Sequence, residues 1–433
     1  MRRERAAIAF VFLIVLATHV AYQYLSQGDY FFPDSFTYLA PTLGMLHGLG
    51  FASDPDDPET LRTPGYPVFL MPFLAMKAKP GAIVFVQHLL YALLAVAVYL
   101  LARRYGAARF ASVTGALVLA LDTITIHYSN KILTETLSAI LIFAVVVLLM
   151  YRRTTLWLVA IGLLCGALVL VRPVAIAWFG VLALWLVWMR ARPIAVIAFI
   201  VASIALPVAW ASRNAARTGV FTISSIGAIN MLSYRAAAAL AIEDGGDFRT
   251  QLTKRQKQLD AIVAGQVKAG EGVESVDEIS SADLSRYHGP LARSILLHHP
   301  WGAALMTMRG FVVNMIDTDW DALAEVVDDD LIPEEATEIA VHAWTWMLWI
   351  AAIFGLVQLW RRNSAAAALV AATIFYFIFM AAGGEAEARF RAPIVPLMAV
   401  AAAFVILSRA DGEESGRGRD SPAQILRALR RSE

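Results

Sequence analysis

Long apolar runs recur along the 433-residue chain, and short polar or basic segments separate them. A spanning helix needs roughly 17–25 mostly apolar residues, because its backbone polar groups must be bonded internally within the lipid. We therefore predict an all-α integral membrane protein with about ten spanning helices. They are expected near Ala6–Leu25, Gly81–Ala102, Phe110–His127, Ile132–Tyr151, Leu156–Val171, Val174–Met189, Ile194–Ala211, Val341–Trp360, Ala365–Ala382 and Pro393–Ser408.

Two stretches break this pattern. Gly65–Met76 is apolar but too short to span comfortably, so we interpret it as an interfacial helix in the first outer loop. Residues 218–338 are too many for a simple connection, and we predict a mostly helical extracytoplasmic loop there. Within this loop, Asp247–Gly270 is typical of a charged surface helix, and His298–Ile316 is amphipathic and expected at the membrane interface.

The pattern divides the chain into four parts. Residues 1–217 form an N-terminal membrane part that includes the first outer loop, 26–80. Residues 218–338 form the long loop, residues 339–409 form the last membrane helices, and residues 410–433 form a polar cytosolic tail. The first 25 residues resemble a signal peptide but lack a small-residue cleavage site, so we interpret them as a retained anchor helix.

Basic residues predict the orientation. Counted from a cytosolic N-terminus, every inner end of a predicted span carries arginine, as cytoplasmic loops do. These residues are Arg2, Arg3, Arg5, Arg103, Arg104, Arg152, Arg153, Arg190, Arg192, Arg361, Arg362 and Arg409. We therefore expect a multi-pass protein of the inner (cell) membrane with both termini in the cytosol.

Composition supports the membrane class. The chain is 59% hydrophobic and 16% charged, against about 25% charged residues in soluble proteins. Its formal net charge is +1, and we expect no nucleic-acid partner. Cys165 is the single cysteine, so an intrachain disulfide is excluded.

Polar residues gather at the predicted outer ends of the spans. They are Asp34, Arg62, His127, Asn130, Lys131, Glu135, Arg172, Arg213, Asn214, Glu385, Glu387, Arg389 and Arg391. Arginines on the outer side run against the usual charge bias, so they need another explanation. Guanidinium groups match phosphate oxygens, and neighbouring carboxylates suit proton abstraction from a hydroxyl. The combination indicates group transfer from a lipid phosphate.

Several short motifs carry a family resemblance. Asp34 is followed by Tyr38 and then by RTPGYP, and further motifs are LTETL at Leu133–Leu137, LVRP ending at Pro173, WASRN at Trp210–Asn214 and RFRAPIVP at Arg389–Pro396. In this order they resemble C-type integral membrane glycosyltransferases. The branch is the one that contains protein O-mannosyltransferases and lipid A aminoarabinose transferases (glycosyltransferase family 39-like). The resemblance covers the membrane part and leaves the long outer loop unmatched.

The resemblance implies a polyprenyl-phosphate sugar donor and a lipid, glycan or protein acceptor at the extracytoplasmic face. Asp34 would deprotonate the acceptor, and Glu135 would be the second acidic residue. Arg389, Arg391 and either Arg62 or Arg172 would neutralise the leaving phosphate. We also assign Tyr38, Tyr66 and His127 to substrate binding, and we expect no metal or other cofactor.

Structural interpretations stand beside each assignment. Asp34 is also suited to capping a helix, and RTPGYP to forming a rigid turn. Glu135 has Lys131 one helical turn earlier as a potential partner, while Arg172 is placed to reach lipid headgroups. Two other functions remain open: a glycan ligase or polymerase that uses a diphosphate-linked oligosaccharide, and a secondary transporter.

Overall fold

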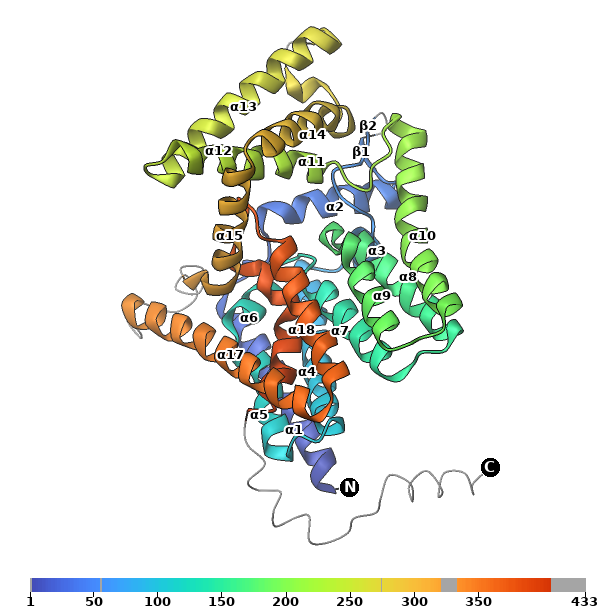
Figure 1. Cartoon of the computed structure of the whole chain (residues 1–433), viewed down its shortest axis with the longest axis vertical. Coiled ribbons are helices and arrows are strands. Elements are labelled where there is room, and N and C mark those ends of the chain that lie inside the picture. Colours follow the sequence, from blue (N-terminus) through green and yellow to red (C-terminus); the bar gives the residue numbers. More distant parts are fainter. Residues whose placement is uncertain (1, 55–56, 274, 321–332, 406–433) are drawn as a thin grey trace.

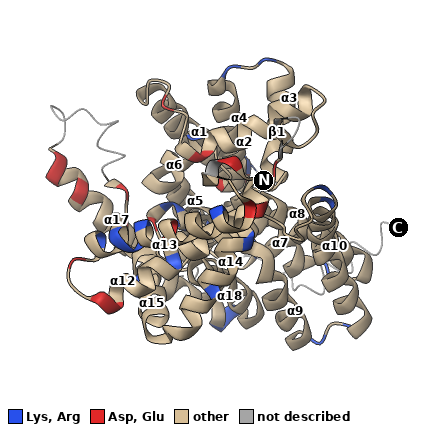
Figure 2. Ribbon diagram, turned by 90° about the horizontal axis from the view of Figure 1, so that it is seen from above, with Lys and Arg blue, Asp and Glu red and all other residues tan. Residues whose placement is uncertain are grey.

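The computed structural model describes residues 2–54, 57–273, 275–320 and 333–405, and these are mostly helical (Figure 1). The predicted polar tail at 410–433 and residues 321–332 of the long loop, a stretch rich in Asp and Glu, lie outside the described residues. Figure 2 shows that long stretches of the helices carry no charged residue, as the apolar runs predict.

Apolar helices form the main bundle. Their bounds are α1 Arg2–Leu25, α4 Pro80–Arg104, α5 Arg109–Leu121, α6 Thr123–Ser129, α7 Glu135–Tyr151, α8 Thr155–Val171, η1 Pro173–Ala177, α9 Trp178–Trp188, α10 Pro193–Thr218, α17 Glu334–Arg362, α18 Ser364–Met380, η4 Ala388–Ile394 and α19 Val395–Ala402. Helix α8 packs along α10, α1 packs along α4, and α17 packs along α19. The core is continuous through this bundle and is lined by buried Leu, Val, Ala and aromatic side chains.

The prediction of about ten spans is not confirmed. Among the described residues, four helices are long and apolar enough to cross a membrane: α1, α4, α10 and α17. Helices α5 and α6 make a fifth span if their 54° bend belongs to one broken segment. Helices also occupy other predicted spans, but α7, α8 and α18 have only 17 residues each. At 1.5 Å per residue, such a helix reaches about 26 Å, which is less than the roughly 30 Å of a hydrocarbon core.

The first outer loop is compact and lies on the bundle. Its elements are α2 Pro33–Leu46, β1 Ala52–Asp54, β2 Asp57–Pro58 and α3 Gly65–Ala75. A helix therefore occupies the segment predicted to be interfacial. Gly65 lets α3 approach α8 closely, because a Cβ atom at this position would lie 2.6 Å from the carbonyl oxygen of Leu170. The glycine of the RTPGYP motif is thus explained by packing.

The long outer loop is helical in its described part. It contains α11 Ile226–Asn230, the π-helix η2 Met231–Ala236, α12 Ala237–Asp244, α13 Phe248–Glu271, η3 Val276–Glu278, α14 Ser281–His298 and α15 Pro300–Ile316. Helices η2, α13 and α14 share a small core of their own, which includes Leu232, Leu259, Val263 and Ala292. Helix α15 returns to the bundle and packs on α18 and η4. The predicted charged helix at Asp247–Gly270 coincides with α13.

Several basic helix ends gather at one end of the molecule. Arg103 and Arg109 pair with Glu4 near the start of the chain, at 3.1 and 3.4 Å. Arg362, at the end of α17, donates a hydrogen bond to the carbonyl of Gly106. Figure 1 shows the N-terminus at this end and the loop helices α11 to α14 at the opposite end. The fold thus separates the arginines used for orientation from those predicted to bind substrate.

Candidate functional site

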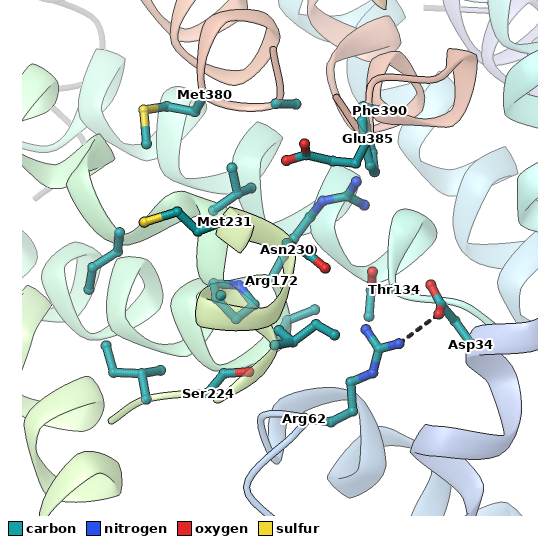
Figure 3. Close-up of a pocket in the computed structure, with 18 of the residues that line it drawn as sticks. Asp34, Arg62, Thr134, Arg172, Ser224, Asn230, Met231, Met380, Glu385 and Phe390 are labelled. Atoms are coloured by element: carbon teal, nitrogen blue, oxygen red, sulfur yellow. Dashed lines mark hydrogen bonds and ion pairs between the residues drawn. The ribbon is translucent and has the colours of Figure 1, made fainter. Parts of the chain in front are cut away.

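A cavity of about 650 Å³ opens where the first outer loop, the bundle and the long loop meet (Figure 3). Its charged lining residues come from segments far apart in the sequence: Asp34, Arg62, Glu135, Arg172, Arg235, Glu385 and Arg389. Another part of its wall is apolar and includes Ile176, Phe221, Ile223, Met231 and Met380. The volume lies within the range typical of small-molecule sites, and both kinds of surface face one space.

Asp34 lies in the first turn of α2, directly after Pro33. The hydroxyl of Ser35 accepts a hydrogen bond from the Phe32 N–H, whereas the Asp34 carboxylate faces two arginines. Its Oδ1 atom lies 2.6 Å from Nη2 of Arg62, and its Oδ2 atom lies 3.1 Å from Nη1 of Arg389. Capping therefore does not account for the side chain.

The two arginines set the charge state of Asp34. Burial raises the pKa of the Asp34 carboxyl group, but the guanidinium groups of Arg62 and Arg389 outweigh this effect and hold the pKa below its ordinary value. At neutral pH the carboxylate is ionised and doubly paired. A carboxylate in this state is a weak base, so its partners decide how readily it takes a proton.

Arg62 is fixed by contacts other than Asp34. Its Nε atom donates to the hydroxyl of Thr37 at 2.8 Å, and its Nη1 atom donates to the hydroxyl of Tyr38 at 3.4 Å. The guanidinium also lies over the Tyr38 ring, 4.9 Å from the ring centroid. Tyr38 therefore lines the cavity and positions Arg62.

Arg389 is held between two carboxylates and two aromatic rings. Its Nε atom pairs with Glu387, its Nη1 atom pairs with Asp34, and the guanidinium lies 4.9 Å from the ring centroid of Phe32 and 5.3 Å from that of Phe390. Burial disfavours its charge, but nearby carboxylates outweigh this effect and raise the pKa of Arg389. For Glu387 the balance is different: burial of the carboxyl group raises its pKa to about 7, although the charge of Arg389 acts to lower it.

Glu135 and Arg172 form a second ion pair in the cavity wall. Glu135 begins α7 and is 3% exposed, and its Oε1 atom accepts from Nη1 of Arg172 at 2.9 Å. Its Oε2 atom is buried and has no hydrogen-bond partner among the described residues. The alternative partner predicted for Glu135 was Lys131, but Lys131 pairs with Asp29.

Sequence reasoning missed one ion pair in the wall. Arg235, in the π-helix of the long loop, donates from Nε to Oε1 of Glu385 at 2.9 Å and from Nη2 to the carbonyl of Met380 at 2.8 Å. The only signal was a single arginine in the mildly apolar segment AINMLSYRAAAALA. Nothing in that run points to Glu385, 150 residues later.

Three of the predicted site residues do not line the cavity. Arg391 is fully buried, and its Nη1 atom donates to the carbonyls of Asn314 and Met315 at 3.1 and 3.0 Å. His127 forms a 2.8 Å hydrogen bond with the hydroxyl of Tyr22.

The third residue, Tyr66, packs behind Tyr38. Its hydroxyl donates to Gln87 at 2.9 Å, and its ring lies edge-on to Tyr38 with centroids 5.2 Å apart. By contrast, six predicted site residues meet at the cavity: Asp34, Tyr38, Arg62, Glu135, Arg172 and Arg389.

The chemistry of the lining favours an anionic ligand with an apolar part. Across the described ranges, no three His, Cys, Asp or Glu side chains are grouped so that they could hold a metal ion. The groups that can hold a ligand are guanidiniums, which match phosphate or carboxylate oxygens. The apolar wall suits a hydrocarbon chain or the face of a ring.

Comparison with known proteins finds similarity among solved structures. No protein-family model and no curated protein matches the chain. A similar solved structure is the archaeal oligosaccharyltransferase AglB from Archaeoglobus fulgidus in complex with an inhibitory peptide and a dolichol-phosphate. The sequence identity is 15% and the TM-score is 0.47; the match covers 99% of this chain and 54% of that one. The chain thus spans about half the length of AglB.

Proposed function

We propose that the protein is a membrane glycosyltransferase that moves a sugar from a polyprenyl-phosphate-linked donor to an acceptor at the extracytoplasmic face. One observation carries the proposal: a carboxylate and two guanidiniums converge at the wall of a cavity that is also lined by apolar residues. The proposed fold type is that of the C-type glycosyltransferases, on the motifs that meet at this cavity.

The apolar wall supports a lipid-borne substrate. Phe221, Ile223 and Met231 enter from the long loop, and Ile176 and Met380 enter from the bundle. For a polyprenyl chain, burial of each methylene group is worth roughly 0.8 kcal/mol. The wall therefore favours a donor whose leaving group is a lipid phosphate.

The charged wall supports the transfer step. The acceptor oxygen or nitrogen attacks the anomeric carbon of the sugar, and the bond between that carbon and the phosphate oxygen breaks. The bonding electrons leave with the phosphate, where Arg62 and Arg389 offset the growing negative charge. The proton of the acceptor passes to Asp34 as general base. Each group involved lines the cavity.

Two further residues support this centre. The unpartnered Oε2 atom of Glu135 is suited to accept a hydrogen bond from the acceptor, while its Oε1 atom holds Arg172. Arg391 acts as a positioning residue in this scheme, because it fixes η4, and hence Arg389, to the end of α15.

Loss of an envelope sugar tests the proposal. Glycans and glycolipids from a strain that lacks the protein are compared by mass spectrometry after complementation with the wild type, Asp34→Asn or Asp244→Asn, at matched membrane levels. Asp244 pairs with Arg255 in the long loop and serves as the control. We expect restoration by the wild type and Asp244→Asn, and at least a 100-fold loss with Asp34→Asn, since general-base catalysis contributes about 10²–10⁴-fold. Full activity of Asp34→Asn would overturn the assignment.

A diphosphate-linked donor is the second candidate. Arg172 and Arg389 both lie 5.3 Å from the ring centroid of Phe390, so a third cation stands close to the two at Asp34. Arg172 also lines the cavity, so its guanidinium is available to contact a second phosphate. Purified protein offered matched monophosphate and diphosphate sugar lipids would distinguish the two donors. Transfer from the diphosphate alone would replace the first proposal.

A further inference from the structure

The Asp34 carboxylate occupies a position that fits one phosphate group. Its two oxygens are each bound by a different guanidinium, Oδ1 by Arg62 at 2.6 Å and Oδ2 by Arg389 at 3.1 Å. Two oxygens of a single phosphate would satisfy the same two donors, because carboxylate and phosphate share this mode of recognition. The catalytic carboxylate and the donor phosphate therefore compete for one pair of arginines.

Other contacts hold both arginine side chains in place when the Asp34 carboxylate moves away. Arg62 is held through Nε by Thr37 and through Nη1 by Tyr38, which leaves Nη2 for Asp34. Arg389 is held by an ion pair between its Nε atom and Glu387 and by the rings of Phe32 and Phe390, and its Nη1 atom donates to Asp34. Nη2 of Arg62 and Nη1 of Arg389, the two donors that converge on Asp34, have no other hydrogen-bond partner among the described residues. Removing the carboxylate exposes a preformed anion site.

We propose that the donor phosphate takes the place of the Asp34 carboxylate between Arg62 and Arg389, and that this exchange turns Asp34 into an active base. The inference rests on the proposed function and adds the order of events. The donor binds first, and the Asp34 side chain then rotates towards the cavity. The acceptor is deprotonated only after the phosphate leaving group is in place.

Electrostatics gives the exchange its effect. In the free protein, the two guanidiniums hold the pKa of Asp34 below its ordinary value. A bound phosphate takes both hydrogen bonds and adds a negative charge nearby, and each change favours the protonated carboxyl group.

The other groups near Asp34 do not reverse this effect. Glu387 remains paired with Arg389, the Glu135 carboxylate remains paired with Arg172, and the Tyr38 hydroxyl remains bonded to Arg62. Asp34 therefore gains proton affinity at the step where the reaction requires it.

Chemical labelling measures this change directly. Carbodiimide modifies protonated carboxyl groups, so the pH midpoint of Asp34 labelling, read by peptide mass spectrometry, follows its proton affinity. Purified full-length protein in lipid nanodiscs is labelled alone, with geranylgeranyl phosphate, and with geranylgeraniol, which has the same chain without the phosphate. Asp244, paired with Arg255 at 2.6 Å outside the cavity, is the internal control.

We expect the phosphate lipid to raise the midpoint of Asp34 by about one pH unit or more, and the alcohol to leave it unchanged. The midpoint of Asp244 should not move with either lipid. Arg62→Gln should raise the Asp34 midpoint without any lipid, because one of the two competing partners is gone.

An unchanged Asp34 midpoint at saturating, independently measured phosphate-lipid binding would overturn the exchange. If the Asp34 midpoint did not change but Asp34→Asn abolished sugar transfer, the proposed function would stand and only the exchange would be wrong. Absence of phosphate-lipid binding, together with transfer by Asp34→Asn, would remove both.

Discussion

At the scale of single residues, the site depends on the shape of its guanidiniums. Arg62 uses Nε, Nη1 and Nη2 for three different partners, Thr37, Tyr38 and Asp34. A lysine ammonium is a compact charge that cannot reproduce this fork. We expect Arg62→Lys to raise the Kd of a polyprenyl phosphate about tenfold, which is roughly 1.4 kcal/mol. Equilibrium binding to nanodiscs checks this, and Arg255→Lys, outside the cavity, should bind like the wild type.

Glu387 predicts a pH dependence of stability. Its pKa of about 7 in the folded protein lies above the ordinary value of 4.5. Between these values the folded state binds more protons than the unfolded state, so this group makes the protein less stable as pH rises from about 4.5 to 7. We expect Glu387→Gln to remove that contribution, so that its thermal midpoint relative to wild type increases between pH 5 and pH 8. An equal difference at both pH values would show that the carboxyl group titrates normally.

Site residues could be predicted from the sequence where their charge and position alone indicated a function. Asp34, Arg62 and Arg389 were recognisable as site candidates because charge at a membrane surface requires a reason, and the structure brings them together. Arg391 was grouped with Arg389 because only one residue separates them. In a 3₁₀-helix each residue turns the chain by about 120°, so the two side chains leave η4 in different directions. Arg235 was missed because its partner is remote in sequence.

At the scale of elements, α3 can pack closely against α8 because Gly65 has no side chain. An added Cβ atom would lie 2.6 Å from the carbonyl oxygen of Leu170, so Gly65→Ala forces the two helices apart. We expect a loss of about 1–3 kcal/mol, the usual cost of overpacking, measured as a lower unfolding midpoint. Gly180→Ala, in α9, is the matched control because an added Cβ atom there meets nothing within 4 Å. Equal midpoints for both variants would refute this role of Gly65.

Element boundaries were more predictable than the number of spans. Long runs of apolar residues mark α4 and α10 clearly, and both helices are long enough to cross a membrane. The same pattern marks α7 and α18, where the predicted spans Ile132–Tyr151 and Ala365–Ala382 are only slightly longer than the 17 residues of each helix. Hydropathy reports how apolar a segment is, whereas helix length depends on capping and packing, which single-sequence patterns describe poorly.

At the scale of the whole molecule, the arrangement of charged ends predicts sidedness. The connection before α8 lies at the same end as the N-terminus, and α13 lies at the opposite end (Figure 1). We expect Thr253→Cys, on α13, to react with a membrane-impermeant maleimide in intact cells or spheroplasts. Thr154→Cys, just before α8, should react only after permeabilisation. The native Cys165 is buried and provides a low background. Labelling of Thr154→Cys alone in intact cells would invert the orientation.

The Arg235–Glu385 ion pair has a consequence for engineering. It joins the long loop to the connection before η4, and both segments contribute side chains to one cavity. The loop is therefore not an exchangeable module that can be grafted between proteins without altering the cavity. Any graft would need to carry its own arginine for Glu385 and its own apolar side chains in place of Phe221 and Met231. The loop and the connection before η4 thus shape one cavity together, and a sequence change in one segment constrains the other.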